Sequence, residues 1–215
     1  TGEIKNWRCF PDEPGREYTM EEIMGNWKNF DRSLTFHGIT YRTEFYREHG
    51  VKLAENVFYE DHEYATYPCC VAHTILPLGL FIYEYRIGDV SQSVSAENQL
   101  KRIDHTKMVI VKMLKNRVDI TDQWALEYCD KKIHLLLLSF MVTSMLCDPD
   151  RKKGVARVDQ LMGYIAKKDR HVVEMTMSHY KILKLLNAAH VGLEGYNRML
   201  NSKLYNKLRH NKSFD

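Results

Sequence analysis

The run IHLLLLSFMVTSML, Ile133–Leu146, is the longest apolar stretch of the chain and indicates where its core lies. It is interrupted by His134 and is shorter than the about 20 residues that a membrane-spanning helix needs. We expect it to form the buried part of a helix over Thr121–Cys147, which ends at Asp148 and Pro149 because proline cannot continue a helix. The run therefore predicts a helical core and not a membrane span.

Helical patterns continue through the whole second half of the chain. Apolar residues recur there at the three- and four-residue spacing of an amphipathic helix, and serine or aspartate stands where a helix would begin. The predicted helices are Ser95 to about Arg117, Thr121–Cys147, a third to about Lys168, Asp169 to about His190, and a fifth after Gly192. Short turns between them predict a compact bundle over residues 95–215.

The first half, residues 1–94, has a mixed pattern. Thr19 and Glu22 form a capping box that predicts a short helix, and a second helix is expected over Thr43–His49. The segment LTFHGITYR, residues 34–42, is rich in β-branched and aromatic residues, which is typical of a strand. Alternation over residues 81–86 predicts another strand. The fold class expected for the chain is therefore α+β.

Composition limits the class of protein. Of the 215 residues 44% are hydrophobic, which is enough to fill a core and excludes a disordered chain. Five cysteines form no repeated metal-binding spacing, so we expect reduced thiols in a cytosolic protein. The start of the sequence predicts no signal peptide.

The net charge of +3 combines two unlike halves: residues 1–94 hold 9 basic and 15 acidic side chains, and residues 95–215 hold 22 basic and 13 acidic ones. The halves thus carry −6 and +9.

The densest group of chemically versatile residues is NVFYEDHEY, residues 56–64. Glu60 and Asp61 follow an aromatic pair, and neighbouring carboxylates point in different directions, so that one can be held while the other meets a substrate. A carboxylate beside an apolar wall can act as a general base on a hydroxyl group. The alternative is an ordinary helix N-terminus, where acidic residues are favoured by the helix dipole.

Several motifs follow one another in a definite order. These are HGITYRTEFYREHG at 37–50, FYED at 58–61, YEYRIG at 83–88 and QSVS at 92–95. In this order and spacing, Ser33–Ser95 resembles the acceptor half of family 2 glycosyltransferases. These are inverting enzymes of the GT-A type that build bacterial polysaccharides and cell-wall decorations. The resemblance implies a partial GT-A mixed sheet over residues 1–94, followed by the helical bundle.

The resemblance also implies catalytic roles for the carboxylate pair. Asp61 would be the general base that deprotonates the acceptor hydroxyl as it attacks the anomeric carbon of a nucleotide-sugar. Glu60 would orient the acceptor or support Asp61. The reaction is then sugar transfer to a saccharide or lipid-linked acceptor with inversion.

Five further residues are candidates for substrate binding. Arg86, Gln92 and Ser93 would lie near the donor diphosphate or the mouth of the acceptor site, because a guanidinium and hydroxyls suit phosphate oxygens. His37 and Tyr41 would line the acceptor pocket. As alternatives, Arg86 is a surface charge and His37 a packed core histidine.

The donor half of such an enzyme has no counterpart before Ser33. We therefore expect this chain to be the C-terminal part of a longer glycosyltransferase and to be inactive alone. A divalent metal, Mg or Mn, would be bound mainly by residues outside this chain. The one DxD string, Asp148–Asp150, lies between two helices and predicts a helix stop and an N-cap, so no metal ligand is assigned.

The expected partners are a nucleotide-sugar donor and a glycan or polyprenyl-linked acceptor, in the cytoplasm or at the inner face of the plasma membrane. Basic residues near the C-terminus could contact anionic lipid, although a solvated helix face is the alternative. They are Lys184, Lys203, Lys207, Arg209 and Lys212. No recognition motif accompanies the charge, so nucleic acid is not expected. The competing function is a non-catalytic helical module that docks a partner protein or an anionic membrane.

Overall fold

The structure, a computed structural model, describes residues 14–31, 33–84 and 95–202. Backbone contacts divide the chain into two compact units, each made of two stretches of sequence. The first unit combines the chain up to residue 90 with residues 108–133, and the second combines residues 91–107 with everything from residue 134 onward. The predicted domains, residues 1–94 and 95–215, stay a prediction.

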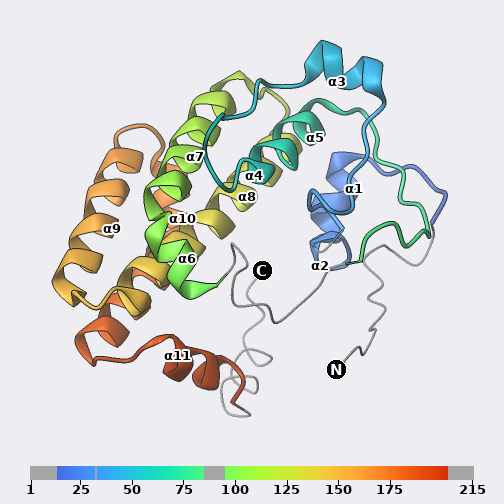
Figure 1. The fold of residues 1–215 in the computed structure, drawn as a ribbon. Coiled ribbons are helices and arrows are strands. Elements are labelled where there is room, and N and C mark those ends of the chain that lie inside the picture. Colours follow the sequence, from blue (N-terminus) through green and yellow to red (C-terminus); the bar gives the residue numbers. More distant parts are fainter. Residues whose placement is uncertain (1–13, 32, 85–94, 203–215) are drawn as a thin grey trace. The chain divides into compact units, whose positions relative to one another are not determined.

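The first unit is built from short helices and from parts of two longer ones (Figure 1). They are α1 (Met20–Gly25), α2 (Trp27–Phe30), α3 (Thr43–His49), α4 (Asp61–Tyr64), α5 (Tyr67–Val71), the end of α7 (Ile103–Asn116), a 3-10 turn (Arg117–Asp119) and the start of α8 (Gln123–Val142). The predicted capping box is present, since the Glu22 N–H donates to Thr19 Oγ1 at 3.3 Å and the Thr19 N–H donates to Glu22 Oε2 at 2.9 Å. Helix α3 has the predicted bounds and ends where the Gly50 N–H donates to the Tyr46 carbonyl.

The core of this unit gathers around an aromatic side chain of α8. Tyr128 is fully buried, and its hydroxyl donates to the Ala65 carbonyl at 2.6 Å. Trp27 meets the Tyr128 ring edge to face at 5.9 Å. Ile23 and Phe30 are almost completely buried as well. Burial of these large apolar surfaces is the dominant stabilising term, so short helices that are marginal alone become stable together.

The predicted α+β fold with a partial GT-A sheet is wrong for the part of the chain that the structure describes. Residues 34–38 form turns, residues 39–42 have no regular secondary structure, and residues 81–84 likewise have none and are exposed. The β-type pairing found among the described residues is a single antiparallel bridge between Tyr18 and Ile75. A strand needs neighbouring strands to satisfy its N–H and C=O groups, and these segments have none here. The described fold is helical.

The second unit holds the remaining helices. They are α6 (Ala96–Lys101), the start of α7, the end of α8, a π-helical turn (Thr143–Cys147), α9 (Arg151–Ala166), α10 (Arg170–Ala188) and α11 (Leu193–Leu200). Ser95 caps α6 through Asn98 N–H, as the sequence predicts, but Arg102 divides the expected single helix into α6 and α7. The π-helical turn packs on α6, α9 and α10.

The apolar run that the sequence singles out lies in the core of the second unit, as predicted. Phe140, Met141 and Met145 are fully buried. Gly154 lets α9 approach closely, because a Cβ atom at this position would stand 2.0 Å from the Ser144 carbonyl oxygen. Among the described residues no helix is both long and apolar enough to cross a membrane.

The aspartates between these helices cap them and end them, as the sequence predicts. Asp150 accepts from the Lys153 N–H at 3.0 Å, and Asp148 forms an ion pair with Arg157. Asp169 caps α10 by accepting from the N–H groups of His171 and Val172 at 2.9 and 3.2 Å. In the Asp148–Asp150 string, Asp150 therefore caps the start of α9, and Asp148 pairs with Arg157.

Replacing Asp169 with alanine removes the acceptor for two N–H groups at the start of α10. We expect the free energy of unfolding to fall by about 1 kcal/mol, the usual effect of losing an N-cap side chain. Denaturant unfolding of the wild type and the Asp169→Ala variant measures this difference. Asp31→Ala, a change at an exposed aspartate that caps no helix start, is the matched control. Equal losses in the two variants would contradict the capping role.

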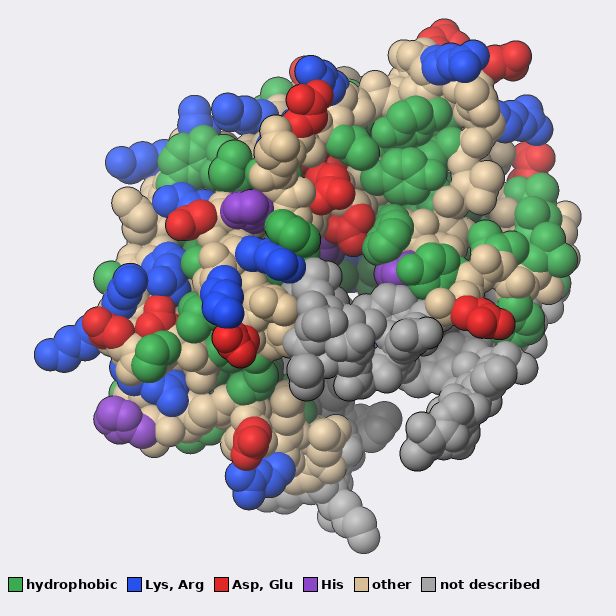
Figure 2. Space-filling view, in the orientation of Figure 1, with side chains coloured by type: hydrophobic (Ala, Val, Ile, Leu, Met, Phe, Trp, Pro, Cys, Tyr) green, Lys and Arg blue, Asp and Glu red, His purple; other side chains and the backbone are tan. Residues whose placement is uncertain are grey.

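Charge on the second unit is mixed. On the face shown in Figure 2, Lys and Arg side chains gather around α9 with acidic side chains between them. Lys184 of α10 is engaged locally, since it donates to the Tyr180 hydroxyl at 2.9 Å and pairs with Asp159 at 3.4 Å. The other predicted lipid-contacting residues lie outside the described part of the chain.

Candidate functional site

The Glu60–Asp61 pair lies in the first unit, at the point where a tight loop enters α4. Asn56 and Tyr59 have positive φ angles of 59° and 74°. Asparagine tolerates this left-handed region, but a tyrosine there costs about 1–2 kcal/mol. The surrounding structure must hold this loop in place, and strained backbone of this kind is frequent at functional sites.

The two carboxylates have similar exposure but different backbone positions. Glu60 stands at the N-cap of α4 without a side-chain hydrogen bond to the helix start, and Asp61 is its first residue. Both side chains are half-buried. Asp61 Oδ1 accepts from the His62 N–H at 3.1 Å. Two adjacent, partly exposed carboxylates thus lie in the first unit, at the start of α4, where the helix fixes the position of their backbone.

Electrostatic contacts identify the groups around Asp61. Burial lowers the pKa of the His37 imidazole, and the negative charge of Asp61 partly offsets this effect. Burial likewise lowers the pKa of His62, again opposed by Asp61, while Lys132 lowers it further. The charge of Asp61 therefore acts on two imidazoles: that of His37, a predicted site residue, and that of His62, which was not predicted.

Lys132 of α8 belongs to the same group and was not predicted. Only 7% of it is exposed, and its ammonium group donates to the Leu34 carbonyl at 2.6 Å. Burial lowers the pKa of Lys132, and the nearby Cys69 and Asp61 oppose that shift. A lysine on the apolar stripe of a helix, one turn after Tyr128, was the available signal. Its proximity to Asp61 depends on tertiary packing.

Tyr41 has a more structural setting than the prediction assigned to it. Its hydroxyl donates to the Tyr64 carbonyl at 2.8 Å and lies 3.2 Å from Cys69 Sγ. Burial raises the pKa of the Tyr41 hydroxyl, so it stays protonated at neutral pH. The ring also contacts Tyr64 edge to face at 5.0 Å. In this position Tyr41 ties the segment before α3 to α4 and α5.

The remaining predicted binding residues, Arg86, Gln92 and Ser93, lie outside the described residues. Their roles stay predictions.

Potential metal ligands do not cluster in the part of the chain that is described, and its thiols are free. No group of three or more His, Cys, Asp or Glu side chains there could hold a metal ion. Cys69, Cys70 and Cys129 are buried free thiols, and Cys147 is free and half-buried. Burial raises the pKa of the Cys69 thiol, which keeps it protonated and unreactive.

The lowered pKa of His62 leads to a pH dependence of stability. In the unfolded chain this imidazole binds a proton at its ordinary pKa of about 6.5, whereas in the folded protein it does so only at lower pH. Protons therefore favour the unfolded state, and we expect the free energy of unfolding to fall as the pH decreases below about 6.5.

Urea unfolding at about pH 7.5 and about pH 5.5 measures this effect. His62→Gln should reduce the difference in stability between the two conditions, although His37 and His179, whose pKa values are also lowered by burial, retain part of it. His73→Gln, at an exposed position, should leave the difference unchanged. If the free energy of unfolding of His62→Gln depended on pH as strongly as that of the wild type, His62 would not be a source of the pH dependence.

Comparison of this chain with protein-family models, with curated proteins and with solved structures finds no match in any of the three.

Proposed function

We propose that this chain provides the acceptor side of an inverting glycosyltransferase, with Asp61 as the general base. The observation that carries the proposal is the arrangement around Asp61. A half-exposed carboxylate begins α4 directly after a strained loop, stands next to Glu60, and acts electrostatically on the imidazole of His37. A general base needs such a defined position and access to the substrate.

The proposed step uses one proton transfer and one displacement. Asp61 accepts the proton of the acceptor hydroxyl while the hydroxyl oxygen bonds to the anomeric carbon of the nucleotide-sugar. The bond between that carbon and the diphosphate oxygen breaks on the opposite face, and the nucleoside diphosphate leaves with the electron pair. Attack and departure on opposite faces invert the configuration.

The reaction class derives from the sequence resemblance, and the GT-A sheet that the resemblance implied is not part of the proposal. The donor and a divalent metal would be held mainly by residues outside this chain. No step assigned to the described residues passes through a metal. A cytoplasmic location, with contact to the inner face of the plasma membrane, is proposed with the function.

A transfer assay on the complete enzyme tests the proposal. Asp61→Asn should lower the rate of sugar transfer by about 10²–10⁴-fold, Glu60→Gln should reduce it less, and far-ultraviolet circular dichroism should show that both variants are folded. Undiminished transfer by Asp61→Asn would exclude the catalytic role. That outcome would favour the competing function, a helical module that docks a partner or a membrane, for which the Asp61 carboxylate is not needed.

A further inference from the structure

The most unusual buried group of the first unit is the carboxylate of Glu63, two residues after Asp61. Its side chain is completely buried. Oε2 accepts from Lys112 Nζ at 2.8 Å and from the Ala54 N–H at 3.2 Å. Among the described residues, Oε1 has no hydrogen-bond partner. One of the two oxygens of this buried carboxylate thus accepts no hydrogen bond from the described residues.

An unused carboxylate oxygen in the interior is costly. Leaving a buried polar atom unsatisfied costs about 1–3 kcal/mol, and more for a charged group. Buried polar atoms in folded proteins are therefore nearly always hydrogen-bonded, either to protein or to ordered water. Glu63 Oε1 needs a hydrogen-bond donor of this kind.

A small cavity beside Glu63 has room for such a donor. It is lined by Glu63, Thr66, Tyr67, Met113, Asn116 and Cys129. The space open to the centre of a water molecule is about 10 Å³, close to what a single buried water requires.

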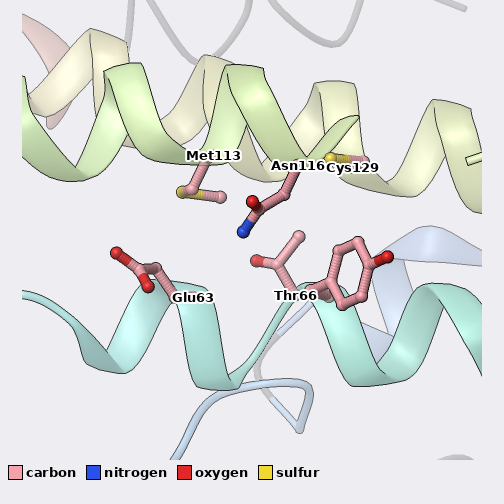
Figure 3. A pocket seen from close by; sticks show the side chains of 6 residues that line it. Glu63, Thr66, Met113, Asn116 and Cys129 are labelled. Atoms are coloured by element: carbon pink, nitrogen blue, oxygen red, sulfur yellow. The ribbon is translucent and has the colours of Figure 1, made fainter. Parts of the chain in front are cut away.

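Polar groups of the lining face one another across this space. Figure 3 shows Glu63 and Thr66 rising from the α4–α5 segment, and Asn116 and Met113 reaching toward them from α7. The Thr66 hydroxyl donates to the His62 carbonyl at 2.6 Å, so the lone pairs of its oxygen remain to accept. The Asn116 amide can donate. Two acceptors and a donor thus stand at the edge of a cavity whose lining is otherwise mostly apolar.

We propose that one water molecule occupies this cavity and links α4 to α7. It donates one O–H to Glu63 Oε1 and the other to Thr66 Oγ1, and its oxygen accepts from the Asn116 amide. Three hydrogen bonds are the usual number for a buried water. With the Glu63–Lys112 ion pair, this water holds α4, and therefore the backbone of Asp61, against α7.

Water-oxygen magnetic relaxation dispersion on the 215-residue chain counts long-lived internal waters and tests the proposal. Asn116→Leu removes the donor and fills the cavity, so we expect the count to fall by one relative to the wild type. Thr66→Val, which keeps the side-chain volume and removes the hydroxyl, should weaken or abolish the same signal. Asn197→Leu, an identical change at an exposed position of α11, should leave the count unchanged.

Amide hydrogen exchange provides the second readout. The Ala65 N–H donates to the Asp61 carbonyl at 2.9 Å, and its exchange reports on the integrity of α4. It should accelerate at least several-fold in Thr66→Val and Asn116→Leu and remain unchanged in Asn197→Leu. Equal water counts in the wild type, Thr66→Val and Asn116→Leu would overturn the proposal. Neither measurement depends on sugar transfer, so the outcome is independent of the proposed enzymatic function.

Discussion

Replacing Asp61 with asparagine is expected to lower the kcat of the proposed glycosyltransferase by about 10²–10⁴-fold, the range that a positioned general base contributes. Asparagine has nearly the same size, and its amide oxygen can still accept from the His62 N–H as Asp61 Oδ1 does. The variant therefore loses proton-accepting ability and keeps the local hydrogen bond. KM should change little, because a group that acts mainly in the transition state contributes little to ground-state binding.

Initial rates of nucleoside diphosphate release, measured over a range of acceptor concentrations, separate kcat from KM. Asp104→Asn is the matched control. It is the same substitution, at an exposed aspartate of α7 that lies outside the first unit. Its kcat should equal that of the wild type. A rise in KM with an unchanged kcat in Asp61→Asn would assign Asp61 to substrate binding and not to proton transfer.

Replacing Lys112 with methionine is expected to destabilise the chain by about 3 kcal/mol. The change leaves the Glu63 carboxylate in the interior without its cation, and breaking a buried ion pair on one side costs about 3–5 kcal/mol. We expect the lower end of this range because 30% of the Lys112 side chain is exposed, although the Glu63 side chain is fully buried. Lys112 also donates to the Lys52 carbonyl, and that contact is lost in the same variant.

A double-mutant cycle separates the ion pair from these other contributions. Glu63→Met combined with Lys112→Met removes both charges, and we expect it to recover most of the stability that Lys112→Met loses, because an apolar pair of similar volume often replaces a buried ion pair at little cost. Lys115→Met, at an exposed position of α7, serves as the control and should change stability by less than about 0.5 kcal/mol. Additive effects of Glu63→Met and Lys112→Met would show that the two side chains do not interact.

Local signals in the sequence were sufficient for most of the helices. The capping box at Thr19, the bounds of the helix Thr43–His49 and the N-cap at Asp169 are all present as predicted. Each depends on residues within one helical turn, so the interacting groups are neighbours in sequence and in space. The apolar run at Ile133–Leu146 predicted a buried helix for a similar reason, since its composition leaves few polar side chains to face water.

The two predicted strands show where local pattern is insufficient. Residues 34–42 and 81–86 have the composition of strands, but strand propensity describes how side chains fit an existing pleated surface. The described residues form no such surface, and the backbone groups of residues 34–38 make turns instead. A segment with the composition of a strand thus forms one only where the fold places another strand beside it, and the segment's own sequence does not show whether it does.

The sequence by itself determined most of the longer helices and several of their caps, and it singled out Glu60 and Asp61 as the most distinctive group of carboxylates. Only the tertiary structure decided that Lys132 lies near Asp61 and that Lys112 neutralises Glu63. The physical reason is the range of the interactions. A cap is a hydrogen bond within one turn, whereas a buried charge is compensated by whichever residue the packing of distant helices brings within reach.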